Sequence, residues 1–273
     1  MRLAYDVRGR GDRALLLLHG FTGNRHTWSR VEPFLADRFR LLRVDLPGHG
    51  DSPPPSLPGR PGFTETLQAL EQILDAEGAP RADVAGYSQG ARLALGLAVE
   101  APGRVERLVM ESGTAGLHRR KDRAARRRAD EHLAEQILSD GVDAFVRRWE
   151  LLPLFDGLRR LPAPDLEALR AGRTSSTAEG LAGALRALGL GVQPDYWPHL
   201  WKLRVPTLLL TGADDAKFTA LARRMAAELP LVWGHAFAGV GHAPHLEVPE
   251  GWAREVIAFL ETPWFEAPVW STA

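Results

Sequence analysis

The stretch VAGYSQG, residues 84–90, decides the fold of this chain. An apolar run from Ala82 to Gly86 leads into the pattern G-x-S-x-G, and a helical pattern follows from Gln89. A strand that turns sharply into a helix holds such a serine in a strained conformation. The helix N-terminus beside it favours developing negative charge. We therefore predict that Ser88 acts as a nucleophile or a base, with Gly86 and Gly90 letting strand and helix approach closely.

Short apolar runs alternate with helical patterns on both sides of this stretch. The expected strands are Ala14–Leu18, Leu41–Val44, Ala82–Gly86, Val105–Met110, Pro206–Leu210 and Leu231–Phe237. The expected helices are Thr64–Glu77, Gln89–Glu100, Phe218–Leu229 and Gly251–Glu261. This alternation predicts an α/β fold, with a mostly parallel twisted sheet and helices on both faces.

The alternation breaks between residues 117 and 200. This segment shows no strand pattern and reads as short helices separated by prolines 153, 162, 164 and 194. We expect an all-helical lid at 117–200, inserted between the core segments 1–116 and 201–273. The second core segment ends in an aromatic tail, with Trp264, Phe265 and Trp270, which we expect to pack against its own domain.

Composition excludes several classes of protein. The 273 residues include 34 basic and 34 acidic side chains and no cysteine. A neutral chain is not typical of a nucleic-acid binder or a polybasic membrane module. The longest apolar run near the start, Ala14–Leu18, is too short to span a bilayer, and we expect no signal peptide before it. We expect a cytoplasmic protein without metal or cofactor, acting on a small molecule; the oligomeric state stays open between a monomer and a weak dimer.

An oxyanion hole requires two backbone donors aimed at one point. The N–H of Gln89, next to the serine, is the first candidate. The second is the N–H of Phe21 in the loop HGFTG, residues 19–23, which follows the strand Ala14–Leu18. Gly20 would let this loop come close, and we expect His19 to structure it. An ordinary glycine turn is the alternative interpretation.

The remaining members of a triad should follow in the order acid, then histidine. TGADD, residues 211–215, offers Asp214 and Asp215, and the G-x-x-D spacing favours Asp215 over a role limited to capping the next helix. GVGHAPHLE, residues 239–247, offers His242 as the base. We expect His245 to support this loop or to pack in the core.

The start of the lid, residues 117–130, is rich in arginine. Most of these side chains are expected on a solvated helix face. An arginine that points inward instead implies a substrate carboxylate or phosphate, because the guanidinium pairs with these groups through two parallel hydrogen bonds.

The whole chain resembles the α/β-hydrolase superfamily. DLPGHGDS, residues 45–52, belongs to this resemblance as a structural turn, while Ser88 differs from the aspartate of the haloalkane dehalogenases. Seven further segments resemble the 2-succinyl-6-hydroxy-2,4-cyclohexadiene-1-carboxylate synthases of menaquinone biosynthesis. They are ESGTAGL (111–117), RRRADE (126–131), FVRRWE (145–150), LPLF (152–155), LEALR (166–170), GLGVQP (189–194) and DAKF (215–218).

This resemblance implies a lyase that eliminates pyruvate from 2-succinyl-5-enolpyruvyl-6-hydroxy-3-cyclohexene-1-carboxylate. The triad would serve as a base, and no acyl-enzyme would form. The resemblance also implies substrate-binding roles for Tyr87, Gln89, Arg126, Trp149 and Arg170. Arg173 is the rival to Arg170. A carboxylesterase or a C–C bond hydrolase would use the same triad, and a non-catalytic binding module is the third interpretation.

Overall fold

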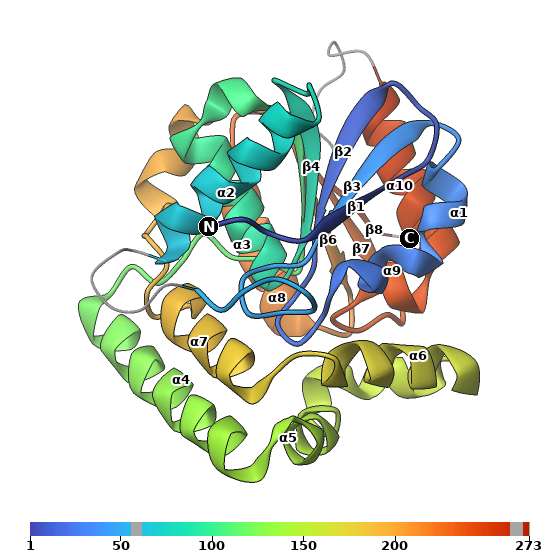
Figure 1. Cartoon of the computed structure of the whole chain (residues 1–273). Coiled ribbons are helices and arrows are strands. Elements are labelled where there is room, and N and C mark those ends of the chain that lie inside the picture. The colour runs from blue at the N-terminus through green and yellow to red at the C-terminus, as the bar shows by residue number, and fades with distance from the viewer. Residues whose placement is uncertain (56–61, 263–269, 273) are drawn as a thin grey trace.

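The computed structural model of this chain describes residues 1–55, 62–262 and 270–272. Its centre is an eight-stranded sheet of order β1-β3-β2-β4-β5-β6-β7-β8 (Figure 1). The strands are β1 (Tyr5–Arg8), β2 (Arg13–Leu18), β3 (Phe39–Val44), β4 (Ala82–Tyr87), β5 (Val105–Glu111), β6 (Thr207–Gly212), β7 (Val232–Phe237) and β8 (Trp270–Thr272). Only β1 pairs antiparallel to its neighbour; the other pairs are parallel. The predicted α/β-hydrolase fold is confirmed.

Helices cover both faces of the sheet because its central strands are apolar on both sides. In β2, Leu16 and Leu18 pack with α2 (Gly62–Ala76) and α3 (Gln89–Glu100) in one buried cluster. Leu15 and Leu17 point the other way and join a second cluster. The helices α1 (Glu32–Leu35) and α10 (Pro249–Glu261) lie in this second cluster, and α8 (Ala216–Ala226) lies in the first. A continuous apolar run is what a strand buried on both faces requires.

Two strands were not predicted, and both lie at the edges of the sheet. The four residues of β1 are partly or fully exposed, so the strand has no buried apolar pattern. The backbone of β8 pairs parallel to β7, with Gly234 opposite Trp270. Trp264 and Phe265 of the aromatic tail lie outside the described residues.

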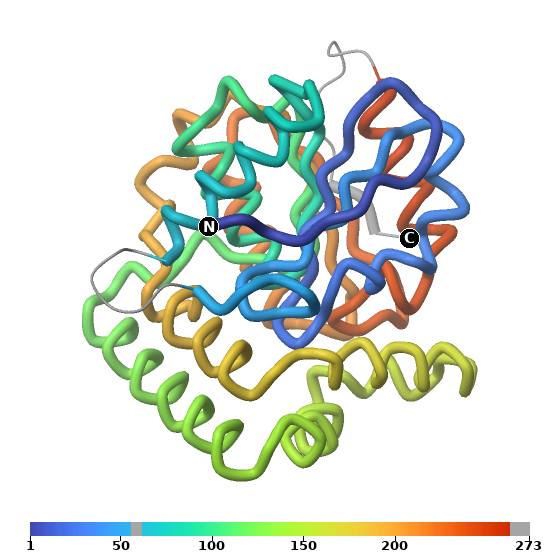
Figure 2. The backbone as a smooth tube through the Cα atoms, viewed as in Figure 1, coloured from blue at the N-terminus to red at the C-terminus, as the bar shows by residue number. Residues whose placement is uncertain are grey.

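The segment between β5 and β6 folds as helices on one side of the core (Figure 2). Its helices are α4 (Arg120–Asp140), α5 (Val142–Trp149), η3 (Pro153–Arg160), α6 (Ala163–Thr174), α7 (Ala178–Leu188) and η4 (Trp197–Lys202). Helices α4, α5 and α7 share a buried apolar cluster that includes Ile137, Phe145 and Leu185. We keep the name lid for residues 117–200.

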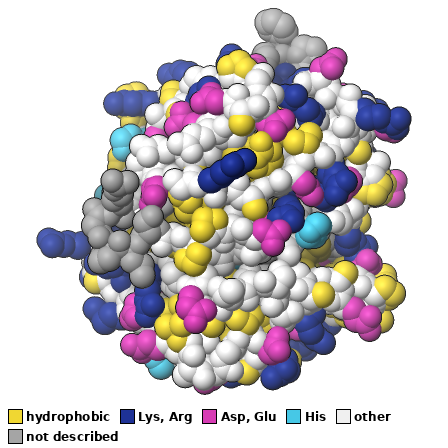
Figure 3. All heavy atoms as spheres, viewed as in Figure 1, with side chains coloured by type: hydrophobic (Ala, Val, Ile, Leu, Met, Phe, Trp, Pro, Cys, Tyr) yellow, Lys and Arg dark blue, Asp and Glu magenta, His cyan; other side chains and the backbone are white. Residues whose placement is uncertain are grey.

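Charged side chains of both signs are interspersed on the surface shown in Figure 3. This distribution agrees with the equal numbers of basic and acidic residues. In the part of the chain that the structure describes, no helix is both long and apolar enough to cross a membrane.

Two glycines allow β4, α3 and β2 to meet at the turn that carries Ser88. A Cβ atom on Gly90 would lie 2.0 Å from the carbonyl oxygen of Leu18. A Cβ atom on Gly86 would lie 2.4 Å from the carbonyl group of Gly90. Both neighbours are backbone atoms, which cannot move aside without displacing a strand or a helix. The predicted close approach is therefore present at both positions.

We expect Gly90→Ala to lower the free energy of unfolding by at least about 2 kcal/mol, because its methyl group would overlap the backbone of β2. Chemical denaturation followed by circular dichroism measures this change. Gly103→Ala is the matched control, since a Cβ atom there meets nothing within 4 Å. Equal stability of the two variants would contradict the packing argument.

Candidate active site

Ser88 lies at the turn between β4 and α3, where its backbone is strained. Its φ of 51° and ψ of −103° place a non-glycine residue at positive φ. The turn is held by the Ser88 N–H, which donates to the carbonyl oxygen of Glu111 at 2.8 Å. The side chain stays partly exposed at the N-terminus of α3. The strain thus presents the hydroxyl at the carboxyl end of the sheet, where strands of a parallel sheet open toward ligands.

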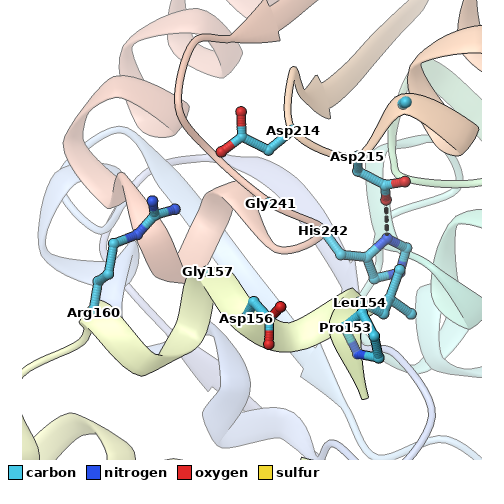
Figure 4. Close-up of a pocket in the computed structure, with 10 residues that line it drawn as sticks. Pro153, Leu154, Asp156, Gly157, Arg160, Asp214, Asp215, Gly241 and His242 are labelled. Atoms are coloured by element: carbon cyan, nitrogen blue, oxygen red, sulfur yellow. Dashed lines mark hydrogen bonds and ion pairs between the residues drawn. The ribbon is translucent and has the colours of Figure 1, made fainter. Parts of the chain in front are cut away.

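His242 and Asp215 meet Ser88 from two other loops. Nε2 of His242 lies 3.3 Å from the Ser88 Oγ, and Nδ1 lies 2.6 Å from Oδ2 of Asp215. Asp215 also caps α8, since its Oδ1 accepts from the Phe218 N–H at 3.1 Å. Asp214 is exposed, and Figure 4 shows its carboxylate away from His242. The structure therefore brings Asp215, not Asp214, into the series serine, histidine, acid.

The two predicted oxyanion donors lie beside this series. Phe21 and Gln89 both line the cavity that contains Ser88. Gln89 is the first residue of α3, so its N–H has no acceptor within the helix. A Cβ atom on Gly20 would lie 2.7 Å from the Tyr87 ring and 3.4 Å from the Ser88 Cβ, which explains the glycine there.

Two buried neutral histidines hold the loop that carries Phe21. Nε2 of His19 accepts from the Leu46 N–H at 2.9 Å, and its Nδ1 lies 2.8 Å from the Gly20 oxygen. Nε2 of His49 accepts from the Thr22 N–H at 3.2 Å. Burial lowers the pKa of His19 to about 4. Burial, together with His19, lowers the pKa of His49 to about 3. The structural role expected of His19 is thus shared by His49, which the sequence analysis had not singled out.

The cavity above Ser88 has a volume of about 200 Å³ and a cationic lining. Arg92, Arg126 and Lys217 line it, and its described lining contains no aspartate or glutamate. Gln89 and Trp149 also line it, and the Nε2 of Gln89 and the Nε1 of Trp149 are buried without a hydrogen-bond partner in the described structure. Cations and unpartnered N–H donors suit a ligand that carries several anionic oxygens.

Arg92 is the residue in this cavity that the sequence analysis missed. Its Nη1 donates to two neutral oxygens, the Leu188 carbonyl at 2.9 Å and the Gln193 Oε1 at 3.1 Å. Burial, and next the charge of Arg126, lower the pKa of Arg92 to about 9. The described residues supply no ion pair to this buried guanidinium. The sequence clue that could have identified Arg92 is its position four residues after Ser88, which places both residues on the same side of α3.

The lid residues predicted to bind substrate divide into two groups. Arg126 and Trp149 line the cavity, as does Tyr87 from β4. Arg170 does not: its side chain is 59% exposed and pairs with Glu150 at 2.7 Å. Arg173, the rival candidate, is buried and also pairs with Glu150, while its guanidinium lies 4.9 Å from the centre of the Phe155 ring.

His245 lies below the site and is fully buried. Its Nδ1 lies 2.7 Å from Oε1 of Glu111, and its ring packs between Tyr87 and Trp28. His245 therefore packs in the core, one of the two roles expected for it. In the described residues, no group of histidine, aspartate or glutamate side chains could hold a metal ion.

Comparisons with known proteins agree with this geometry. Residues 13–249 match the family described as alpha/beta hydrolase fold. An Escherichia coli (strain K12 / DH10B) 2-succinyl-6-hydroxy-2,4-cyclohexadiene-1-carboxylate synthase is 34% identical over 87% of this chain and 89% of its own length. A Bacillus subtilis (strain 168) protein that carries the same name provisionally is 36% identical, over 93% of each chain. The chain belongs to this synthase family of α/β hydrolases.

Solved structures share the fold of this chain. The structure of MenH from S. aureus superposes with a TM-score of 0.88, at 30% identity over 94% of this chain and 97% of that one. A malate-bound thermophilic esterase from Thermogutta terrifontis superposes with a TM-score of 0.82, at 25% identity over 94% of this chain and 92% of that one. The resemblance inferred from the sequence is confirmed.

The two neutral histidines predict how stability depends on pH. Below the ordinary histidine pKa of 6.5, His19 and His49 bind protons in the unfolded chain. In the folded chain their lowered pKa values keep both side chains neutral down to about pH 4. The free energy of unfolding should therefore fall as the pH falls from 6.5 to about 4. His49→Gln keeps an acceptor for the Thr22 N–H but does not titrate, so its stability should fall less steeply over this range.

Thermal unfolding at a series of pH values measures both slopes. The control is His199→Gln, which replaces an exposed histidine and should keep the wild-type slope. A His49→Gln variant with the wild-type pH dependence would show that His49 is not held neutral.

Proposed function

We propose that this protein eliminates pyruvate from 2-succinyl-5-enolpyruvyl-6-hydroxy-3-cyclohexene-1-carboxylate, with Ser88, His242 and Asp215 as the base. Names of the relatives point to this reaction. The observation that carries the proposal to this chain is the cavity above Ser88. Its described lining includes Arg92 and Arg126 and no carboxylate, so it suits a substrate with several carboxylates of its own.

The difference between substrate and product defines the chemistry. The ring of the substrate has one double bond, at C3, and the product has two, at C2 and C4. A base therefore removes the proton from C2, the double bond shifts, and the bond from C5 to the enolpyruvyl oxygen breaks. The leaving enolpyruvate takes up a proton and becomes pyruvate. No water is added and no acyl group is transferred.

The proposed base uses the geometry at Ser88. Asp215 holds Nδ1 of His242, so that Nε2 can take the proton from the Ser88 hydroxyl. The Ser88 oxygen then removes the C2 proton, which is acidified by the neighbouring succinyl carbonyl group. Negative charge develops on that carbonyl oxygen, and the N–H groups of Phe21 and Gln89 would stabilise it.

The proposed substrate contacts follow from charge. The substrate carries three carboxylates, and a buried guanidinium without an ion-pair partner is costly. We assign one carboxylate to Arg92, which has no ion pair among the described residues, and a second to Arg126, whose Nε also pairs with Asp130; Lys217 lines the same cavity. Arg170 and Arg173 would act indirectly, by fixing Glu150 beside Trp149 on α5.

An esterase is the second candidate function. The superposition with the thermophilic esterase favours it, because an esterase needs the same three residues. Its acyl-enzyme would have to form at Ser88 and be hydrolysed by water. The cationic cavity offers no reason for a neutral ester to bind, so we rank this function second.

The proposed substrate and products are small charged molecules. A charged small molecule is the only partner that the proposal needs, and we propose a cytoplasmic location.

Ser88→Ala should reduce the rate of pyruvate release by at least about 10³-fold, because the proposed base is removed. Pyruvate is measured with the substrate generated in situ. Ser112→Ala is the control, since Ser112 does not line the cavity. Near-normal release by Ser88→Ala would contradict the proposed role. Serine-dependent cleavage of short acyl esters without pyruvate release would favour the esterase.

Arg126→Ala should raise KM for the substrate at least about tenfold, because a charge-assisted pair with a carboxylate is lost. Its melting temperature should fall only slightly, because the substitution removes the 2.7 Å ion pair with Asp130 from an arginine side chain that is 41% exposed. Arg128→Ala, two residues along α4 at an exposed position, is the matched control. A parallel loss of stability and affinity would instead indicate a structural role for Arg126.

A further inference from the structure

Glu247 stands against the backbone of the loop that carries His242. Its side chain is 5% exposed, and each carboxylate oxygen accepts a hydrogen bond from this loop. Oε2 accepts from the Gly241 N–H at 2.9 Å, and Oε1 accepts from the Ala243 N–H at 3.3 Å. The two N–H groups flank His242 on either side. One carboxylate therefore fixes both peptide groups next to the proposed base.

The lid contacts the same carboxylate through η3. Nη2 of Arg160 donates to Oε2 of Glu247 at 3.1 Å and to the Gly239 oxygen at 2.8 Å. A Cβ atom on Gly157 would lie 2.1 Å from Oε2 of Glu247, so the η3 backbone packs directly against the carboxylate. Figure 4 shows Gly157 and Arg160 on η3, with Gly241 and His242 on the facing loop. Lid and histidine loop thus share one charged group.

The same short helix also contributes to the cavity that contains Ser88. Phe155 of η3 lines the cavity above Ser88, and its ring centre lies 6.3 Å from that of His242. Leu154 lines both this cavity and the cleft of about 420 Å³ in Figure 4. A displacement of η3 would therefore alter the surroundings of His242 and its backbone support together.

We propose that Glu247 is a positioning residue for His242, and that Arg160 and Gly157 couple the lid to it. This inference rests on the proposed function, in which His242 activates Ser88. Glu247 contacts neither substrate nor Ser88; it keeps the His242 ring at hydrogen-bond distance from the Ser88 Oγ. The lid segment η3 completes the support by bringing the Arg160 guanidinium and the Gly157 backbone onto the carboxylate.

Glu247→Gln tests the positioning role. An amide keeps one acceptor oxygen but faces the other backbone N–H with a donor, so the loop loses one of its two anchors. We expect kcat for pyruvate release to fall about 10- to 100-fold, as for a catalytic group displaced by up to about 1 Å. KM should change less than about twofold, because no substrate contact is lost. In a Ser88→Ala background the same substitution should have no further effect on the residual rate.

The arginine offers a second variant that spares the buried carboxylate. Arg160→Ala should lower kcat about two- to fivefold, as expected for an exposed ion pair. Arg159→Ala is the matched control. The two side chains are 59% and 60% exposed, but among the described residues Arg159 pairs with Asp156, within η3 itself. The double variant of Arg160 and Glu247 should be no slower than Glu247→Gln alone, since both act through one carboxylate.

Different outcomes would overturn the positioning role of Glu247 and the proposed function. Wild-type kcat in Glu247→Gln, or a loss of kcat that only follows the folded fraction, would overturn the positioning role. If Glu247→Gln does not fold, equal kcat in the Arg160 and Arg159 variants overturns it. Pyruvate release that is unaffected by Ser88→Ala would contradict the proposed function instead.

Discussion

The contact of α3 with the backbone of β2 is the constraint on which the site depends. Gly90 lets the helix lie against the Leu18 carbonyl group, and the turn before it must then place Ser88 at positive φ. The strained turn directs the hydroxyl toward the loops that follow β2, β6 and β7. Those loops supply Phe21, Asp215 and His242. Without this contact, the residues of the site would be present in the chain but would not converge.

Histidines and arginines in different surroundings have different roles in this structure. Burial keeps His19 and His49 neutral, so they serve as hydrogen-bond acceptors for the loop of Phe21. His242 instead lies between an acid and a hydroxyl, where it can take up a proton. Arg92 and Arg126 line a cavity whose described lining contains no carboxylate, whereas Arg170 and Arg173 share Glu150. The substrate would supply the carboxylate that Arg92 lacks, whereas Asp130 already pairs with Arg126 and Glu150 with Arg170 and Arg173.

Local patterns in the sequence predicted the parts of the structure that have local causes. The strand–serine–helix pattern located Ser88. The G-x-x-D spacing in residues 212–215 favoured Asp215 over Asp214. Lid contacts depend on how helices pack over the sheet. The family resemblance therefore implied a substrate contact for Arg170, although the structure leaves its side chain exposed. Arg92 was missed because helix periodicity alone does not show which side chains remain without a partner. The edge strand β1 was missed because its four residues carry no buried apolar pattern, and β8 was missed because its three residues lie within the aromatic tail.

Removal of the C2 proton is the central claim, and an isotope effect tests it most directly. Substrate that carries deuterium at C2 should release pyruvate more slowly than the protiated substrate under kcat/KM conditions. Intact-mass measurement of the enzyme during turnover should show no covalent adduct on Ser88. Equal rates for the two substrates, together with an acyl adduct on Ser88, would contradict the account and identify a hydrolase.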